Sequence, residues 1–398
     1  MSIRNVGKKV VVGLKEKKTE RRENADFKRY MRWKKLVMNF WFMRKDRNEL
    51  CNEYNLTDEE RKAIDTLYKN NYGKKVSYKW HKIFANATGN LDPNFIPLNL
   101  YLSETEFFLN PYRKYITVYE NKYIMSLLAK AIGVKTPKIY FTCTNGKIIN
   151  SDFNVIDERE LEKNLENIGE IFMKPHMDSS GGKNCFTYNV MDGRDIDSGK
   201  TVKEILQEMG DNYVIQNVIR NHESISNIYS KSLNTFRIVT YKWNGDEVFC
   251  APAVMRMGRN GSYLDNASSG GIYIAVEKNG QLHDIAMSNL GSEKVYVHPD
   301  SNIKFGEYKI KDITDILEAA KRMHRALPMV GIVNWDFAMD SDGDPVLIEA
   351  NVSGGGIDMI QFAWGKGIFG EKTKDVLRWT KLMKKSSLKE RKKHYFGV

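Results

Sequence analysis

VGIVNWDFAM (residues 330–339), DSDGD (340–344) and PVLIEAN (345–351) follow one another in the sequence, and this stretch decides the fold. Its two apolar runs have the composition of β-strands, and the Asp-Ser-Asp-Gly run between them is typical of a turn, so the stretch predicts a hairpin. Asp336 and Glu349 interrupt the two runs, and the hairpin brings them close together. Burying two like charges side by side is costly, so we expect a cation between these carboxylates.

Asp336, Glu349 and Asn351 offer oxygen ligands, with no His or Cys in the same stretch. Hard oxygen ligands of this kind suit Mg²⁺ or Mn²⁺, and Mg²⁺ held in this way generally binds the phosphates of a substrate. Solvated acids at the end of an ordinary hairpin are the simpler interpretation when the motif is taken alone. The other motifs of the chain therefore have to decide between the two.

The chain has 398 residues, of which 41% are hydrophobic, enough to bury a large core in two or three lobes. No apolar run reaches the roughly 18 residues of a membrane-spanning helix, and the amino-terminal end has no apolar signal-peptide core. Cys51, Cys143, Cys185 and Cys250 are dispersed, which favours a reducing compartment over a disulfide framework or a zinc site. The sequence therefore predicts a cytoplasmic protein.

The net charge of +12 is concentrated at the two ends of the chain. Residues 1–50 carry +10 and residues 371–398 carry +7, which leaves −5 for the rest. Because the body is mildly acidic, we expect no nucleic acid among the partners. Residues 28–44 interleave aromatic and basic side chains. Two interpretations stay open for them: a helix packed on the body of the protein, or peripheral contact with an anionic membrane at its inner face.

Helical and strand patterns divide the chain into four expected regions: a basic helical region at 1–100, lobes at 101–215 and 216–370, and a basic helical tail at 371–398. Thr57 and Glu60 form a capping box that opens a helix over 58–70. The prolines of residues 86–111 indicate a connector. Apolar residues at helical spacing predict helices over 119–132, ended by Gly133, and over 311–327.

A lysine and a glycine-rich run mark a candidate phosphate site. IFMK (171–174) reads as a strand, SSGG (179–182) as a loop and CFTYNV (185–190) as the returning strand. Backbone N–H groups of such a loop can cover phosphates while the lysine supplies a point charge, although an ordinary turn is the simpler interpretation. SGKT (198–201) nearly matches a P-loop, but Asp195 and Asp197 repel phosphate, and Thr201 with Glu204 predicts a capping box instead.

NYVIQNVI (212–219) reads as a short buried strand that ends at polar residues. A strand of this kind offers backbone N–H and C=O groups to a flat heterocycle, and the carboxylate of Glu223, four residues beyond, can reach a ribose. Taken alone, the segment is a core strand. Its value for function lies in its order relative to the other motifs.

The order of these motifs resembles the ATP-grasp fold. Asp336, Glu349 and Asn351, at offsets of 13 and 2 with GGG following, resemble the metal hairpin of D-alanine:D-alanine ligases. The fuller pattern is similar to the bacterial sugar-transfer-associated ATP-grasp family and adds Asn110-Pro111, YENK (119–122), SLNTFRIVT (232–240) and Tyr78-Lys-Trp80. The resemblance covers about residues 55–370. It implies an α/β (α+β) chain with an ATP-grasp fold, a phosphate flap in the 101–215 lobe, the metal hairpin in the 216–370 lobe and a basic helical amino-terminal region.

The resemblance also implies a role for individual residues. The phosphates of ATP are held by Lys122 and Lys174 beneath a flap made of Ser179, Ser180, Gly181 and Gly182. Adenine contacts Gln216, Asn217, Val218 and Ile219, and Glu223 binds the ribose hydroxyls. Asp336, Glu349 and Asn351 coordinate two Mg²⁺ ions, with Glu349 bridging and Mn²⁺ as an alternative. Two such ions neutralise the charge between the β- and γ-phosphates during transfer.

One position departs from the ligases. Asn334 stands where D-alanine:D-alanine ligases carry an Arg that stabilises the tetrahedral intermediate, and losing such a cation weakens catalysis by several kcal/mol. Arg237 or Arg256 is therefore expected to take this catalytic role, unless the acceptor chemistry differs. Arg256 lies in a polar, Gly-rich stretch at 254–271 that reads either as a substrate loop or as a surface hairpin.

The resemblance implies an ADP-forming ATP-grasp ligase that converts a carboxylate to an acyl phosphate and passes it to an amine. The expected setting is capsule, exopolysaccharide or other surface-glycan assembly, with an amino acid and a uronic or amino sugar as the small-molecule partners. Two alternatives stay open: a kinase that phosphorylates a sugar or lipid-linked hydroxyl, and a non-catalytic basic protein that binds membrane or nucleic acid. The presence of both lysines and all three metal ligands in one chain argues against the second.

Overall fold

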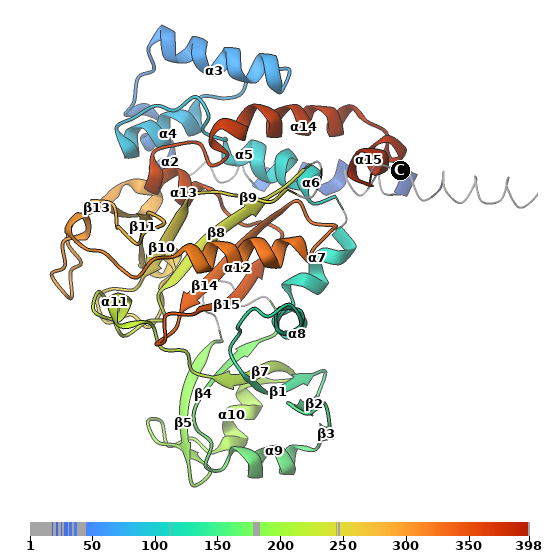
Figure 1. The fold of residues 1–398 in the computed structure, drawn as a ribbon, viewed down its shortest axis with the longest axis vertical. Coiled ribbons are helices and arrows are strands. Elements are labelled where there is room, and N and C mark those ends of the chain that lie inside the picture. Colours follow the sequence, from blue (N-terminus) through green and yellow to red (C-terminus); the bar gives the residue numbers. More distant parts are fainter. Residues whose placement is uncertain are drawn as a thin grey trace, which may run out of the picture. The chain divides into compact units, whose positions relative to one another are not determined.

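The computed structural model describes residues 45–111, 113–177, 184–243, 245 and 247–396, with scattered positions between Lys18 and Val37. The chain splits into two compact units, whose elements are labelled in Figure 1. One unit comprises residues 1–109, 243–245 and 365–398, and the other comprises 110–242 and 246–364. The four regions expected from the sequence stay predictions.

The first unit is helical in its described part. Its elements are α2 (Lys45–Asn52), α3 (Asp58–Asn71), α4 (Lys79–Thr88), α5 (Leu98–Leu100), the π-helical η1 (Tyr101–Thr105), α6 (Glu106–Leu109), the 3₁₀ turn η6 (Gly370–Lys372), α14 (Thr373–Lys385) and α15 (Leu388–Phe396). The capping box before α3 is confirmed, because the Glu60 N–H donates to the Thr57 hydroxyl and the Thr57 N–H donates to the Glu60 carboxylate.

The connector expected over residues 86–111 is wrong for its second half, which is continuous helix from Leu98 to Leu109. Pro97 precedes the first turn, where a missing N–H costs the helix nothing, so the prolines do not prevent it. The buried carboxylate of Glu104 fixes the helix within this unit, since Lys384 Nζ lies 2.6 Å from it and the Tyr72 hydroxyl donates to it.

The second unit contains two antiparallel sheets. The seven-stranded sheet has the order β3-β2-β1-β7-β4-β5-β6. Its strands are β1 (Ile139–Thr144), β2 (Lys147–Asn150), β3 (Val155–Ile156), β4 (Gly169–Pro175), β5 (Phe186–Met191), β6 (Arg194–Asp195) and β7 (Asn212–Asn217). Two helices, α9 (Glu158–Leu165) and α10 (Val202–Met209), cover one face, and Thr201 with Glu204 forms the expected capping box of α10. Leu161, Leu165, Ile205 and Leu206 of these helices share one buried cluster with Ile171, Met173 and Ile215 of the sheet.

The eight-stranded sheet has the order β13-β12-β11-β10-β8-β14-β15, with β9 paired to β8. Its strands are β8 (Thr235–Tyr241), β9 (Phe249–Cys250), β10 (Ala253–Met257), β11 (Ile272–Val276), β12 (Ala286–Ser288), β13 (Glu293–Val295), β14 (Ile332–Met339) and β15 (Pro345–Asn351). The expected hairpin is confirmed, because β14 pairs with β15 and Asp336 lies directly opposite Glu349. The register shifts between Asp336 and Phe337, which leaves Ile348 as the extra residue of a β-bulge beside the two acids.

Helices cover the apolar face of this sheet. α12 (Thr314–Arg325) lies over the sheet in Figure 1 and shares its buried cluster. The helix predicted from the sequence over 311–327 is therefore confirmed, with slightly shorter bounds. The helix expected at 119–132 is instead two helices, α7 (Arg113–Glu120) and α8 (Lys122–Ala131), because the Asn121 side chain caps α8 by accepting the N–H groups of Tyr123 and Ile124. Among the described helices, none has the length and apolar content to cross a membrane.

Candidate functional site

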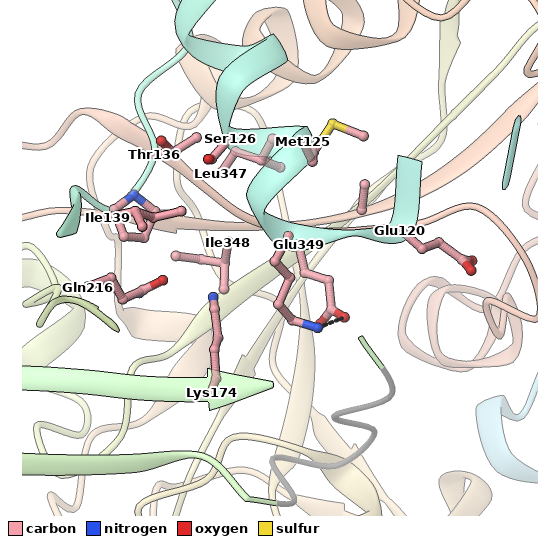
Figure 2. Close-up of a pocket in the computed structure, with 13 residues that line it drawn as sticks. Glu120, Met125, Ser126, Thr136, Ile139, Lys174, Gln216, Leu347, Ile348 and Glu349 are labelled. Carbon is pink, nitrogen blue, oxygen red and sulfur yellow. Dashed lines mark ion pairs between the residues drawn. The ribbon is translucent and has the colours of Figure 1, made fainter. Parts of the chain in front are cut away.

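A pocket in the second unit brings together both sheets and α8 (Figure 2). Residues of five segments line it: Glu120, Lys122, Met125 and Ser126 of the α7–α8 region, Thr136, Pro137 and Ile139 leading into β1, Lys174 of β4, Gln216 of β7, and Leu347 to Ala350 of β15. Two lysines and two acids therefore surround a partly apolar space. Four of the residues expected to bind nucleotide or metal line this pocket: Lys122, Lys174, Gln216 and Glu349.

Lys174 extends from the end of β4 into the pocket (Figure 2). It lies opposite Val214 of β7, and residues at alternate positions of these strands point to the same face, so Lys174 and Gln216 share the face that α9 and α10 leave uncovered. Lys174 is 5% exposed. Burial, together with the nearby Lys122 ammonium, lowers the pKa of Lys174 to about 8, although Glu349 opposes the shift.

Lys122 is the first residue of α8, and its Nζ lies 3.1 Å from Glu349 Oε1, the ion pair drawn as a dashed line in Figure 2. The backbone N–H of Lys122 donates to the carbonyl of His176, two residues beyond Lys174. This bond ties the start of α8 to the end of β4. The two candidate phosphate lysines are thereby held on neighbouring elements with one carboxylate between them.

The face of the eight-stranded sheet opposite α12 carries a cluster of polar side chains among apolar ones such as Val239 and Val254. Strand register places Glu349 of β15 beside Asp336 of β14, and Asp336 beside Arg237 of β8. Farther along the same face, Thr235 of β8 lies beside Arg256 of β10, and Arg256 beside Tyr273 of β11. Asn351 and Asn334 form the next pair along the hairpin, on the same side. We call this set the polar face: Thr235, Arg237, Arg256, Tyr273, Asn334, Asp336, Glu349 and Asn351.

Asp336 is held by two guanidinium groups. Arg237 Nε lies 2.6 Å from Oδ1 and Nη2 lies 3.3 Å from Oδ2, while Arg256 Nη2 lies 3.1 Å from Oδ2. Burial alone would raise the pKa of Asp336, but the two guanidinium groups outweigh it and lower the pKa. Asp336 therefore carries a negative charge although it is 5% exposed.

Asp265 holds Arg256 in place. Its Oδ2 lies 3.6 Å from Arg256 Nε and accepts the N–H of Thr235 at 3.1 Å. The Thr235 hydroxyl also donates to Asp265 and lies 3.1 Å from Arg256 Nε. Burial alone would lower the pKa of Arg256, but Asp265 and Asp336 more than offset it and the pKa is raised. Arg256 sits in β10 rather than in the loop that follows, so the loop proper spans residues 258–271.

The glycine run at residues 354–356, which follows β15, crosses the polar face. A Cβ added to Gly355 would lie 2.3 Å from Asn334 Nδ2, so the backbone of this loop rests directly on the Asn334 side chain. Asn334 is 1% exposed, and its Oδ1 has no hydrogen-bond partner within the described chain. The close approach leaves no room at position 334 for a longer side chain. Arg237 on the neighbouring strand β8 and Arg256 on β10 stay the candidates for the charge that an arginine at position 334 would supply.

The donor set fits a hard divalent cation. Asp336, Glu349 and Asn351 present carboxylate and amide oxygens on one face of the hairpin, and the orphaned Asn334 Oδ1 lies beside them. Such oxygens are the ligands that Mg²⁺ prefers. Lys122, Arg237 and Arg256 pair with the two acids in this structure. The metal role of Asp336, Glu349 and Asn351 therefore stays a prediction.

The residues expected around adenine and ribose are less closely grouped. Gln216 lines the pocket, whereas the Asn217 side chain accepts the N–H of Lys138, and Val218 and Ile219 follow β7 half-buried. Glu223 is exposed at the start of α11 (Glu223–Ser226). Ser179 to Gly182 lie outside the described residues. The roles of Asn217, Val218, Ile219, Glu223 and the flap stay predictions.

Two residues near the site, Tyr273 and Asp358, were not among the sequence predictions, and Asp265 was included only as part of the candidate substrate loop at 254–271. Asp265 lies in the 258–271 loop and reaches Thr235 and Arg256 through its carboxylate, Tyr273 joins the polar face through strand pairing, and Asp358 lies beyond the glycine run at the start of α13 (Asp358–Trp364). None of them belongs to a recognisable local motif. The order β14-β8-β10-β11 of the sheet brings Tyr273 toward the metal hairpin.

The two sheets, the lysines between them and the acidic hairpin define an ATP-grasp protein. Residues 103–376 match the family described as sugar-transfer associated ATP-grasp, and the chain belongs to that family. The resemblance and the fold class expected from the sequence are therefore confirmed, and with them an ATP-binding role in general terms.

Solved structures of low sequence identity are similar to the chain. They include an L-amino acid ligase from Bacillus licheniformis (14% identity, TM-score 0.36, 66% of this chain and 48% of that one). D-alanyl-alanine synthetase A from Vibrio cholerae (13%, 0.38, 67% and 65%) and a D-alanine–D-alanine ligase from Bacillus anthracis (15%, 0.35, 69% and 69%) are two others. The chain spans about half the length of the L-amino acid ligase. No curated protein sequence matches it.

Proposed function

We propose that this chain is an ADP-forming ligase that joins a carboxylate to an amine through an acyl phosphate. The observation that carries the proposal is the polar face, where the half-buried Arg237 and the buried Arg256 both contact Asp336, which lies beside Glu349. Guanidinium groups bind carboxylates in a fixed, bidentate geometry. Two of them next to the candidate metal hairpin suit a carboxylate that must be held against the γ-phosphate of ATP.

The proposed reaction has two steps. A carboxylate oxygen attacks the γ-phosphorus and the bond to the ADP oxygen breaks, which gives an acyl phosphate and ADP. The amine nitrogen then attacks the acyl carbon, the carbon–oxygen bond to phosphate breaks, and the amine loses a proton. Negative charge builds on the acyl oxygen in the second step, and Arg237 or Arg256 stabilises it in place of the arginine absent at position 334.

The lysines and the hairpin would hold the nucleotide. Lys174 and Lys122 bind the phosphates, with Ser179 to Gly182 above them, while Gln216 to Ile219 contact adenine and Glu223 the ribose. Asp336, Glu349 and Asn351 would hold two Mg²⁺ ions, or Mn²⁺, with Glu349 shared between them. When bound, these ions neutralise charge on the β- and γ-phosphates. Asp336, Glu349 and Asn351 offer oxygen ligands only, which supports this assignment.

The family supports a role in sugar transfer, so we propose that the reaction links an amino acid to a uronic or amino sugar in capsule, exopolysaccharide or another surface glycan. A kinase that phosphorylates a sugar or lipid-linked hydroxyl is the alternative. The paired arginines favour the ligase, because a hydroxyl acceptor carries no charge for them to bind.

The proposal is tested by ADP release. The full chain is incubated with ATP, Mg²⁺ and a panel of amino acids, glucuronate and glucosamine, with hydroxylamine added to trap an acyl phosphate as a hydroxamate. We expect ADP and a hydroxamate in reactions that contain the carboxylate substrate. ADP with a stable phosphorylated sugar and no hydroxamate would favour the kinase.

We also propose peripheral contact with an anionic membrane at its inner face. Most of residues 28–44 lie outside the described residues, but Trp33, Leu36 and Val37 are spaced as one helical face and are 56%, 50% and 42% exposed. Basic helices with such a face bind anionic lipid. Full-length protein should sediment with vesicles that contain phosphatidylserine and be released by salt. A chain beginning at Asn52 should stay in solution. Equal sedimentation of the two chains would contradict the proposed membrane contact.

A further inference from the structure

The helical unit contains a groove that takes no part in the proposed ligase. It lies between α3 and α14, both labelled in Figure 1, and has a volume of about 570 Å³. Its α3 wall is a single helical face, because the lining residues from Glu59 to Asn71 recur at three- and four-residue spacing. That face runs for about 18 Å at a rise of 1.5 Å per residue. A concave surface of this size is typical of a ligand site.

Three cations and one acid line the groove. Lys62 belongs to α3, and Lys374 and Arg378 stand one helical turn apart on α14. The acid is Glu59. Lys374 and Arg378 belong to the basic tail at residues 371–398, whose charge of +7 has no role in the proposed ligase. Both walls of the groove therefore carry positive charge.

The two lysines of the groove differ from a neighbouring lysine of α3 in their pairing. Within the part of the chain that the structure describes, no carboxylate oxygen lies within 4.0 Å of the Lys62 or Lys374 ammonium group. Lys69, on another face of α3, pairs with Asp65 at 3.7 Å. Like charges gathered around a concave surface repel one another, and an anionic ligand would relieve that repulsion.

The third cation, Arg378, is held by a buried amide. Asn71 is 5% exposed, and its Oδ1 accepts the Arg378 Nε–H at 2.9 Å while its Nδ2 donates to the carbonyl of Leu67 at 2.8 Å. Asp375 Oδ1 lies 3.6 Å from Arg378 Nη1. These contacts orient the guanidinium group, and Nη2 takes part in neither of them. The groove therefore contains one cation whose orientation is fixed from below.

We propose that this groove binds an acidic oligosaccharide, with sugar carboxylates at its three cations and sugar hydroxyls at Thr66 and Asn70. Hydroxyl and amide side chains both donate and accept hydrogen bonds, as sugar hydroxyls do. The inference goes beyond the proposed ligase, because it gives the helical unit and the basic tail a ligand of their own.

Two features favour an acidic sugar over another anion. Glu59 can accept hydrogen bonds from sugar hydroxyls, whereas it repels a ligand that presents only phosphates, such as a nucleic acid or a lipid surface. The chain also belongs to a family described as sugar-transfer associated. A flat membrane would reach the ends of the lysines but not the wall at Ala63, which is exposed within the groove.

The test measures binding without turnover, so that its result does not depend on the ligase proposal. The full chain is titrated with trigalacturonate, an acidic trisaccharide, and with maltotriose, a neutral one, by calorimetry in the absence of ATP. We expect binding of trigalacturonate that weakens as salt screens the cations, and no binding of maltotriose. Absence of trigalacturonate binding, or equal binding of the two sugars, would overturn the proposal.

Three variants locate the ligand. Lys62→Gln removes one cation, and Ala63→Phe fills the groove without changing its charge, so each should weaken trigalacturonate binding at least fivefold. Lys69→Gln removes a cation of the same helix outside the groove and should leave the affinity unchanged. If Ala63→Phe bound as tightly as the wild type, the sugar would lie on the charged surface and not in the groove.

Vesicles that contain phosphatidylserine distinguish a lipid from a sugar. Ala63→Phe should sediment with them as the wild type does. Loss of sedimentation in Ala63→Phe with unchanged trigalacturonate binding would assign the groove to lipid and overturn the proposal. Melting temperatures and ATP affinity of each variant are measured alongside. Since Lys62 is exposed and unpaired within the described chain, Lys62→Gln decides the question even if Ala63→Phe fails to fold.

Discussion

The two faces of the eight-stranded sheet are built from alternate residues of the same strands, yet they have opposite properties. In β14, Trp335 and Phe337 are fully buried in the apolar cluster under α12, whereas Asn334 and Asp336 point to the polar face. Burial of apolar side chains on the first face stabilises the fold. On the polar face, the charged side chains form ion pairs. Substitutions on the two faces should therefore separate stability from activity.

Glu349→Gln should have the largest effect. It removes the charge proposed to be shared between two metal ions but keeps the shape of the side chain, so we expect turnover to fall at least about 1,000-fold, or about 4 kcal/mol in the barrier. Steady-state ADP release measures the loss, and circular dichroism should show an unchanged fold.

Two variants of the same hairpin calibrate this effect. Asp344→Asn changes an exposed carboxylate of the turn and should leave turnover unchanged. Asn351→Ala removes a neutral ligand and should lower turnover less than Glu349→Gln does. Near-normal turnover in Glu349→Gln would make Glu349 an ordinary hairpin residue, and the two faces would not differ in function as proposed.

Phe337→Ala should have the next largest effect, on the apolar face. The side chain is 0% exposed in the cluster beneath α12, and truncating a buried phenylalanine costs about 3–4 kcal/mol of unfolding free energy. Urea denaturation measures the change. Phe153→Ala, at a 65% exposed site, should cost less than about 1 kcal/mol. If the two variants were equally stable, the apolar face would not carry the fold.

The apolar face also contains one buried polar cluster, which should make stability depend on pH. The Thr240 hydroxyl bonds to His324 Nδ1 at 2.6 Å and accepts the Trp335 Nε1–H at 2.7 Å. Burial lowers the pKa of His324 to about 3, while the unfolded chain has the usual value of about 6.5. The contribution of neutral His324 to the free energy of unfolding is complete above about pH 6.5. It is lost as the pH falls from about 6.5 toward 3.

At pH 5 this loss should amount to about 2 kcal/mol. Urea denaturation at pH 7 and pH 5 measures it, and His324→Asn should show a smaller difference between the two pH values than the wild type. The partly exposed His283→Asn serves as the control and should keep the wild-type difference. An equal pH dependence in His324→Asn and wild type would show that His324 is not held neutral by its burial.

Lys174→Gln should have the smallest effect, on nucleotide affinity. Removing one point charge from the phosphate site should weaken ATP binding about tenfold, or about 1.4 kcal/mol. Because the pKa of Lys174 is lowered to about 8, ATP affinity of the wild type should also fall as the pH rises through 8. The variant should show less of this fall when binding is measured by calorimetry.

Lys200→Gln is the matched control for Lys174→Gln. Lys200 belongs to the SGKT run that nearly matches a P-loop, but its Nζ pairs with Glu208 at 2.7 Å on the surface of the lobe. The Lys200→Gln substitution should leave ATP affinity unchanged. A stronger effect at Lys200 than at Lys174 would move the phosphate site away from the pocket between the sheets.

The sequence predicts the part of the site that is local. Asp336 and Glu349 interrupt two apolar runs that are joined by a short turn, so their meeting follows from the hairpin alone. Tyr273 reaches the polar face through strand order and Asp358 follows the glycine loop, neither of which a local pattern predicts, whereas Asp265 lies in the stretch that the sequence marked as a candidate substrate loop. The helix at Leu98–Leu109 differs from the prediction for another reason, because a proline that precedes the first turn of a helix, such as Pro97, does not break it.

The central claim is that the polar face transfers the γ-phosphoryl group to a carboxylate. Phosphorus NMR of the full chain with ATP, Mg²⁺ and the substrate panel tests it most directly. The account predicts that ATP is converted to ADP and inorganic phosphate together with an amide product. AMP with pyrophosphate would contradict the claim, since it requires attack at the α-phosphorus.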